Sequence, residues 1–384
     1  MTPSPSIFSM APYIPPDAIF ALTAEYNADP SPVKVNLGQG TYRDNHGLPW
    51  VLPSVEKDRR ILNEKGLGLR DGAARLVFGE GYTTIAEKLA TSQAISGTGS
   101  LHLAGVYIPS PTWLNHHLLF SSLGFTVNEF NYYNSATRSL DIDSYFATLR
   151  SADTGSVVVL HACAHNPTGL DPDTEQWKQI GAIIKERQLF PVFDAAYLGF
   201  NSGNYDKDAW AIRYFVNELE VECAVCLSFA KNMGLYGERV GVLIIATADA
   251  VLAKNTQSVL ESLQRSEISN PAAFGAKIAE AILANDQLKG VWFEDLKTMS
   301  GRIAEMRVLF DGLARYASAK NWDHLVKQSG MFGFLGLERQ VVRVLKDEYH
   351  IYMAENSRIS IAGLNAENVD YVARSIGEVL TREQ

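Results

Sequence analysis

Lys231 stands in a polar stretch of the sequence, residues 228–239, between two apolar runs. The runs, residues 223–227 and 240–246, are short and almost wholly apolar, which is typical of buried strands. The polar stretch is therefore predicted to be a loop that joins two core strands. A lysine in such a loop is a candidate covalent catalyst, because partial burial lowers the pKa of its amine and frees the lone pair.

Residues on either side of this lysine suit a phosphate group. Ser228 offers a hydroxyl donor, and Arg239 offers a guanidinium that can bind two oxygen atoms. A second cluster, Ser96, Gly97 and Thr98, offers hydroxyl and N–H groups at a predicted helix start, where an anion binds well. An imine-forming lysine beside a phosphate site is the arrangement expected for pyridoxal 5′-phosphate (PLP). The alternative at this point is a solvated loop with ordinary surface charges.

Four polar residues lie at or just beyond the ends of predicted strands. They are Ser96, Asn166, Asp194 and Ser228, and the strands are residues 92–96, 157–161, 190–197 and 223–227. These strands alternate with amphipathic helical patterns, which predicts an α/β fold with a mostly parallel sheet. Ligands of such sheets bind at the carboxyl ends of the strands. We therefore expect the four side chains to meet in one site.

The pattern changes from about residue 299 to long helices and short strands. The last helix is predicted to start near Asn365, a residue type favoured as an N-cap. We therefore expect a second, smaller α+β domain. The predicted division is residues 1–43 for an N-terminal arm and part of the small domain, residues 44–298 for a large cofactor-binding domain, and residues 299–384 for the small C-terminal domain.

The charge of the chain argues against a polyanionic partner. The 384 residues carry a formal net charge of −9, and the pI is about 5.5. We therefore expect neither nucleic acid nor an anionic membrane surface as a general partner. No apolar run approaches the roughly 20 residues of a membrane span, and the N-terminus lacks the basic segment of a signal peptide. The expected location is the cytoplasm.

The cysteines predict neither a disulfide framework nor a metal site. There are three of them, Cys163, Cys223 and Cys226. Cys223 and Cys226 stand three apart in a predicted strand, so their side chains point to opposite faces and cannot share a metal ion. We expect them to be small core residues.

Several motifs taken together carry a resemblance to a known family. Besides residues 228–239, they are residues 94–99 (Ala-Ile-Ser-Gly-Thr-Gly), 111–116 (Pro-Thr-Trp-Leu-Asn-His), 161–169 (His-Ala-Cys-Ala-His-Asn-Pro-Thr-Gly), 193–197 (Phe-Asp-Ala-Ala-Tyr) and 358–363 (Arg-Ile-Ser-Ile-Ala-Gly). With them the sequence resembles, over nearly its whole length, the aspartate aminotransferases of the fold-type I PLP-dependent enzymes. The resemblance implies a seven-stranded sheet, PLP as cofactor and a homodimer with shared active sites.

The resemblance also implies a role for each cofactor contact. Lys231 would hold PLP as an imine and later move a proton between the substrate Cα and the cofactor C4′. Asp194 would keep the pyridine nitrogen protonated, and Tyr197 and Asn166 would hydrogen-bond the phenolic oxygen of the ring. Trp113 would stack on the ring face. The other implied contacts are His116, which would orient the aspartate, and Ser96, Gly97, Thr98, Ser228 and Arg239, which would hold the phosphate.

The implied substrate contacts select dicarboxylates. Arg358 would grip the α-carboxylate as a bidentate pair, helped by the Gly40 N–H group, while Trp113 and Asn166 would line the same site. Arg265, supplied by the neighbouring subunit, would bind the distal carboxylate. The implied ligands are small dicarboxylic amino acids and 2-oxo acids. The implied reaction moves the amino group by a ping-pong mechanism between L-aspartate and 2-oxoglutarate, giving oxaloacetate and L-glutamate.

Two segments are shorter than the family pattern. Residues 63–69 lack the tyrosine that the family places there for the partner subunit's phosphate. Only seven residues separate Thr98 from Val106, whereas a parallel crossover needs about 10–12. We therefore expect a shortened crossover after Thr98. The alternatives to an aspartate aminotransferase are an enzyme for aromatic or kynurenine-type substrates, and a weakly active, shortened homologue that acts through dimerisation.

Overall fold

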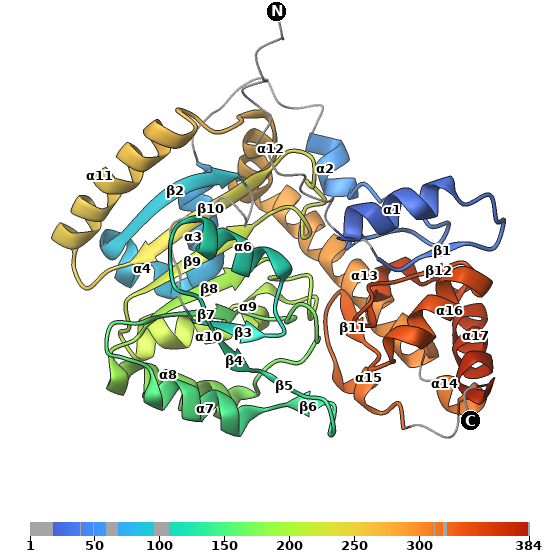
Figure 1. Cartoon of the computed structure of the whole chain (residues 1–384). Coiled ribbons are helices and arrows are strands. Elements are labelled where there is room, and N and C mark those ends of the chain that lie inside the picture. Colours follow the sequence, from blue (N-terminus) through green and yellow to red (C-terminus); the bar gives the residue numbers. More distant parts are fainter. Residues whose placement is uncertain are drawn as a thin grey trace, which may run out of the picture.

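A mixed β-sheet lies at the centre of the structure, a computed structural model that describes residues 18–38, 40–48, 50–58, 68–95, 107–310, 312–317 and 321–382. In this described part the sheet has seven strands in the order β2-β10-β9-β8-β7-β3-β4 (Figure 1). The strands are β2 (Leu89–Ile95), β3 (Tyr107–Ser110), β4 (Asn128–Asn131), β7 (Val157–His161), β8 (Phe190–Ala195), β9 (Cys223–Ser228) and β10 (Val240–Ala246).

Most of the sheet is parallel, as the alternating pattern predicts. The strands β4, β3, β7, β8 and β9 are parallel neighbours, and only β10 runs against the strands beside it. His161 pairs with Asp194 across β7 and β8, and Asp194 pairs with Cys226 across β8 and β9. The carboxyl ends of these three strands therefore meet at one edge of the sheet.

Helices cover both faces of the sheet (Figure 1). Buried side chains of α8 and α3 pack with Cys223 and Val225 on one face, and Leu260 of α11 packs with Cys226 on the other. The two cysteines thus lie on opposite faces, as predicted. The helices of this part are α2 (Pro53–Asp58), α3 (Leu69–Phe78), α4 (Tyr82–Ile85), α6 (Leu114–Ser122), α7 (Ile142–Ser151), α8 (Thr174–Arg187), α9 (Tyr205–Asp208), α10 (Trp210–Arg213), α11 (Ala250–Glu267) and α12 (Phe274–Ala284).

Local signals explain where several of these helices begin. Asp173 caps α8 through the Gln176 N–H group, and the Gln176 side chain bonds back to the Asp173 N–H group in a capping box. Asp141 and Asp249 cap α7 and α11 in the same general way. The last helix differs from the prediction, because α17 begins at Val369. Asn365 instead accepts the N–H groups of residues 367 and 368 in the turn that precedes α17.

The beginning and the end of the chain pack together beside the sheet. The helix α1 (Ala18–Ala28) and the strand β1 (Val35–Asn36) lie next to β12 and α16 (Figure 1). The strand β1 pairs with β12 in parallel, and β11 pairs with β13 in the antiparallel sense. The other elements here are α13 (Asp286–Phe310), α14 (Leu313–Tyr316), α15 (His324–Lys327), β11 (Phe332–Phe334), α16 (Arg339–Tyr349), β12 (Ile351–Tyr352), β13 (Arg358–Ser360) and α17 (Val369–Arg382).

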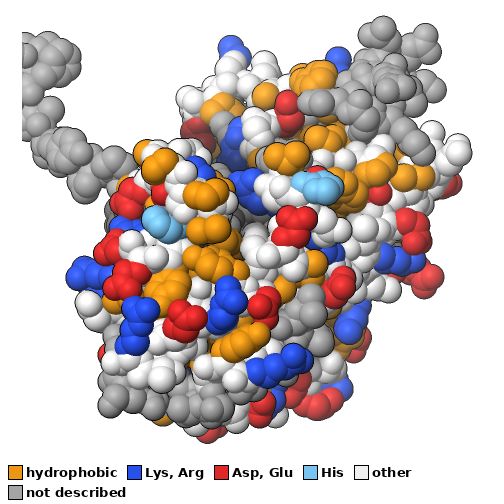
Figure 2. Space-filling view, turned by 90° about the vertical axis from the view of Figure 1, so that its right-hand side faces the viewer, with side chains coloured by type: hydrophobic (Ala, Val, Ile, Leu, Met, Phe, Trp, Pro, Cys, Tyr) orange, Lys and Arg blue, Asp and Glu red, His pale blue; other side chains and the backbone are white. Residues whose placement is uncertain are grey.

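The helix α13 runs across the expected boundary between residues 298 and 299. The division into three segments therefore stays a prediction. The two shortened segments, at residues 63–69 and 98–106, fall almost wholly outside the described residues, and so does the expected crossover. Among the helices that the structure describes, none is long and apolar enough to cross a membrane. On the face shown in Figure 2, acidic and basic side chains are interspersed rather than gathered by sign.

Candidate active site

A cavity of about 710 Å³ lies at the carboxyl edge of the sheet, between the sheet and the C-terminal elements. Loops after β7, β8 and β9, the start of α6, the strands β11 and β13 and the start of α1 all contribute to its wall. The predicted site residues that line it are Gly40, Trp113, Asn166, Asp194, Tyr197, Ser228, Lys231, Arg239 and Arg358. These nine residues come from six separate stretches of sequence, which the fold brings to one place.

The amine of Lys231 lies inside this cavity. Its Nζ atom is 4.7 Å from the centre of the Tyr197 ring. Burial lowers the pKa of Lys231, and the nearby Arg239 and Arg358 lower it further, whereas Asp194 acts in the opposite direction. A lowered pKa increases the fraction of neutral amine, which is the nucleophilic form.

Asp194 is buried at the end of β8 and remains ionised. Burial by itself would raise its pKa, but the hydrogen bond from His116 and the electrostatic effects of His116 and Lys231 act against burial, and the pKa is lowered. The His116 Nε2 atom lies 3.2 Å from Asp194 Oδ2. Because a carboxylate can only accept, Nε2 carries the proton of that imidazole.

A hydroxyl group joins the two histidines behind this carboxylate. The Thr112 Oγ1 atom is 2.8 Å from His116 Nδ1 and 3.1 Å from His161 Nε2. His116, His161 and Asp194 offer ligand atoms within 4.8 Å of one another, a spacing that a metal ion could use. Hydrogen bonds already engage these atoms, so we interpret the cluster as support for Asp194.

Arg358 is held by acceptors from two distant segments. Its Nη1 atom donates to Asn166 Oδ1 over 3.3 Å, and its Nη2 atom donates to the Gly38 carbonyl oxygen over 2.9 Å. The guanidinium also lies 4.4 Å from the centre of the Phe332 ring, a cation–π distance. The planar group is thus fixed with one face on an aromatic ring at the wall of the cavity.

The residues expected around a phosphate group are only partly described. Ser228 is buried at the end of β9, and its hydroxyl accepts the Ala230 N–H group. Arg239 lines the cavity, is exposed and donates to the Tyr236 carbonyl oxygen over 3.2 Å. Ser96, Gly97 and Thr98 lie outside the described residues.

Two further predicted residues do not line the cavity. His116 lies behind Asp194, as expected for a residue that orients it. Arg265 is exposed on α11 and donates to the hydroxyl of Ser269. Within the described part of one chain, therefore, this arginine is not among the residues that surround Lys231.

Some residues of the site were not predicted. Thr112, Phe332 and Tyr236 line the cavity, and the Tyr236 hydroxyl accepts the Tyr42 N–H group over 3.2 Å. Thr112 and Tyr236 lie inside motifs that the sequence singles out, so proximity to those motifs was the available signal. Nothing in the pattern of Phe332 distinguishes it from a core phenylalanine, because only the pairing of β11 with β13 brings it to Arg358.

The fold and the site together define an α/β protein with a lysine of lowered pKa in a cavity at the carboxyl edge of its sheet. The family model described as aminotransferase class I and II matches residues 32–376, and the chain belongs to this family. It is 43% identical to aspartate aminotransferase 1 of Medicago sativa, with 100% of this chain and 98% of that protein covered. The aligned length of 412 exceeds the 384 residues of this chain, so the relative has stretches without a counterpart here.

Solved structures agree with this assignment. The aspartate aminotransferase from the Saccharomyces cerevisiae cytoplasm matches with a TM-score of 0.94 and 40% identity, over 98% of this chain and 99% of that chain. An aromatic-amino-acid aminotransferase from Burkholderia pseudomallei, covalently bound to pyridoxal phosphate, matches with a TM-score of 0.94 and 35% identity, over 98% of this chain and 100% of that chain.

Proposed function

We propose that this chain is an aspartate aminotransferase that moves the amino group between L-aspartate and 2-oxoglutarate, giving oxaloacetate and L-glutamate. The observation that carries the proposal is the meeting of Lys231, Asp194 and Arg358 at one cavity. Membership of the family and the printed names of the relatives from Medicago sativa and Saccharomyces cerevisiae support the choice of substrates. The relative from yeast is named cytoplasmic, which supports a cytoplasmic location for this chain.

The donor groups of the cavity fit PLP. An amine of lowered pKa suits its aldehyde carbon, a buried ionised carboxylate suits its pyridine nitrogen, and the Tyr197 hydroxyl and Asn166 amide suit its phenolic oxygen. The residues that would hold the cofactor are Trp113, His116, Asn166, Asp194, Tyr197, Ser228, Lys231 and Arg239, with Ser96, Gly97 and Thr98 outside the described part. When bound, PLP supplies an electron-withdrawing ring that stabilises negative charge at the substrate Cα.

The residues of this chain then have three tasks. Lys231 moves a proton at the substrate Cα, for which an amine of lowered pKa is suited because it titrates nearer to neutral pH. Asp194 holds a proton on the pyridine nitrogen by remaining negative beside it. Arg358 binds and orients the α-carboxylate, and Gly40 lies beside Phe332, the ring on which Arg358 packs.

The distal carboxylate needs a second cation, and we propose that a partner subunit supplies it. Arg265 is exposed and lies away from its own cavity. Leu114 and Leu118 line the cavity yet are 60% and 63% exposed, and the helix that carries Arg265 exposes Val251 and Val259. Apolar side chains left open at the mouth of a site are typical of a surface that another chain covers. We therefore propose a homodimer with shared active sites.

An enzyme for aromatic amino acids is the second candidate. Leu114 and Leu118 give the cavity an apolar rim, and the neighbour from Burkholderia pseudomallei carries the name of an aromatic-amino-acid aminotransferase. An arginine at the distal carboxylate would favour dicarboxylates, because a neutral side chain leaves that charge without a partner. Rates with L-aspartate, L-glutamate, L-phenylalanine, L-tyrosine and L-kynurenine decide between the two candidates.

The replacement Lys231→Ala tests the catalytic lysine. We expect the visible absorbance band of lysine-bound PLP to disappear and kcat for L-aspartate to fall at least about 100- to 10,000-fold, because the proton carrier is lost. Lys178→Ala serves as the control, since the Lys178 side chain is 44% exposed, pairs with Glu175 and does not line the cavity. A wild-type protein that shows no such band with added PLP would contradict the proposal and favour a non-catalytic homologue.

A further inference from the structure

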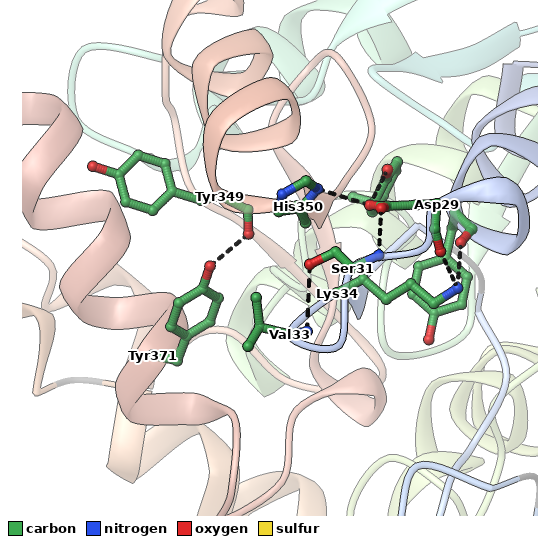
Figure 3. Close-up of polar contacts among 9 residues, drawn as sticks. Asp29, Ser31, Val33, Lys34, Tyr349, His350 and Tyr371 are labelled. Carbon is green, nitrogen blue, oxygen red and sulfur yellow. Dashed lines mark hydrogen bonds and ion pairs between the residues drawn. The ribbon is translucent and has the colours of Figure 1, made fainter.

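Asp29 lies at the junction between α1 and the C-terminal elements. Its carboxylate accepts three hydrogen bonds, from the Ser31 N–H group over 2.8 Å, His350 Nδ1 over 2.8 Å and the Tyr352 hydroxyl over 2.7 Å. Figure 3 shows Asp29 and His350 pointing toward one another, one from the N-terminal segment and the other from the end of α16. The Asp29 side chain is only 8% exposed, whereas His350 is 37% exposed.

Neighbouring contacts fix both sides of this junction. Lys34 donates to the Asp29 carbonyl oxygen over 2.7 Å and to the Tyr26 carbonyl oxygen over 3.0 Å. On the opposite side, Tyr371 of α17 donates to the Tyr349 carbonyl oxygen over 2.7 Å, next to His350 (Figure 3). The end of α1 is therefore tied to β12 and to the connection between α16 and β12, which Tyr371 of α17 supports from the other side.

The other end of α1 reaches the active-site cavity. Ile19, near the start of the helix, lines that cavity. Leu22, one turn further along, packs on Gly38 so closely that a Cβ atom on that glycine would lie 2.6 Å from Leu22 Cδ2. An α-helix rises about 1.5 Å for each residue, so the anchor and the cavity lie at opposite ends of one short rigid element.

Gly38 connects this helix to the substrate-binding arginine. Its carbonyl oxygen accepts the Arg358 Nη2 group over 2.9 Å. The chain arrives at Gly38 from β1, which pairs with β12 beside Tyr352, and the Leu37 carbonyl oxygen accepts the Ser360 N–H group over 2.7 Å. A shift of α1 at Leu22 therefore acts directly on an acceptor that orients the guanidinium.

We propose that Asp29 is a positioning residue for transamination: by tying the end of α1 to His350 and Tyr352, it holds Leu22 on Gly38 and so keeps Arg358 aimed at the substrate α-carboxylate. Asp29 contacts neither the cavity nor the residues around Lys231, and its effect passes through α1. This inference rests on the proposed function, because the α-carboxylate is the ligand assigned to Arg358.

The test compares Asp29→Asn and Leu22→Ala, made in the PLP-loaded enzyme, singly and together. Asn keeps the shape of the carboxylate but removes its charge and turns one acceptor into a donor that faces His350 and Tyr352. We expect KM for L-aspartate and Kd for succinate, measured by calorimetry, to rise about five- to tenfold in each single variant, with kcat within about twofold. The visible band of bound PLP should stay unchanged, and the double variant should lose no more than either single one.

Hydrogen exchange supplies a readout that does not depend on activity. We expect the amides of α1 and of residues 35–38 to exchange faster in Asp29→Asn, while those of α8 remain protected. Asn27→Ala is the matched control, because Asn27 is exposed on the same helix. Its KM and exchange should match the wild type.

Three outcomes would overturn the inference. The first is a wild-type KM and succinate Kd in folded Asp29→Asn. The second is a joint fall of kcat, PLP occupancy and melting temperature, which is a general loss of stability. The third is an additive effect in the double variant. If Asp29→Asn fails to fold, Tyr352→Phe removes one donor and should raise KM to a smaller extent. A wild-type enzyme without transaminase activity would contradict the proposed function. The Kd for succinate would still show whether each variant weakens carboxylate binding by Arg358.

Discussion

At the scale of single residues, Thr112 determines how the buried carboxylate is supported. Its hydroxyl bridges His116 and His161, and burial lowers the pKa of His161 well below its ordinary value, so that ring is neutral. A hydroxyl can donate to one imidazole and accept from the other, which fixes both rings. The orientation of the His116 ring, and with it the hydrogen bond to Asp194, therefore depends on the hydroxyl group of Thr112.

Replacement of Thr112 by Val tests this support. The change keeps the shape of the side chain but removes both hydrogen bonds. These bonds hold His116 in place with about 1–2 kcal/mol of free energy, so we expect a roughly 5- to 30-fold lower kcat. Steady-state kinetics with L-aspartate measure the effect. Thr112→Ser keeps the hydroxyl and should stay close to the wild type. Equal loss in both variants would mean that the side-chain volume, not the hydroxyl, is what matters.

At the scale of elements, Asp208 holds the loop that carries Tyr197. It ends the short helix α9, is buried, and accepts the N–H groups of Gly199 over 2.9 Å and Ser202 over 3.2 Å. Burial raises its pKa from 3.8 to about 6, although the hydrogen bonds from Ser202 and Gly199 act against this shift. The loop after β8 is therefore held by a carboxyl group whose pKa differs between the folded and the unfolded protein.

The sign of the resulting pH dependence follows from linkage. Between about pH 4 and pH 6 the folded state keeps the Asp208 proton and the unfolded state does not, so the free energy of unfolding falls as the pH rises through this window. A variant Asp208→Asn lacks this titration. We expect the stability of the wild type relative to Asp208→Asn to fall by roughly 1–3 kcal/mol from pH 4 to pH 7. Urea unfolding at several pH values measures it, with the exposed change Lys207→Gln as control, and parallel pH profiles for wild type and Asp208→Asn would contradict it.

At the scale of the whole molecule, one continuous core links the sheet to the C-terminal elements. Trp292 and Ile303 of α13 belong to the same buried cluster as Val225 of β9 and Leu345 of α16. The cavity is therefore bounded by parts that are packed together, while Arg265 and the exposed Val251 and Val259 of α11 lie on the outside. This arrangement supports the proposal that a second subunit completes the site with its Arg265.

Subunit complementation tests the shared site. Lys231→Ala and Arg265→Ala should each be nearly inactive with L-aspartate. When the two are unfolded and refolded together, half of the dimers are mixed and each contains one site with both residues intact, so about a quarter of the wild-type activity should return. Recovery is measured by the aspartate assay after gel filtration. The absence of any recovery in dimers shown to be mixed would mean that Arg265 does not serve the partner's site.

Strong local patterns made much of the fold predictable. The strands β7, β9 and β10 agree with the predicted runs to within a residue, because their apolar runs are bounded by polar loops. The last helix was predicted to start near Asn365, whereas α17 begins at Val369. Asn365 and Asn368 nevertheless exchange side-chain hydrogen bonds with each other's N–H groups in the turn that leads into α17, as residues of a capping box do. Roles for Asp194, Lys231 and Arg358 could be stated because their motifs resemble those of a family.

The sequence by itself determined the chemistry of the residues: a lysine between two buried strands, a carboxylate at the end of another, and arginines in polar loops. Only the tertiary structure decided which of them face one another. The parallel order of β7, β8 and β9 brings Asn166, Asp194 and Lys231 to one edge, and the packing of α1 against β12 brings Gly38 to Arg358. The contact between Gly38 and Arg358 joins residues 320 positions apart. No local periodicity records such a contact, because it depends on how separate elements pack into one core.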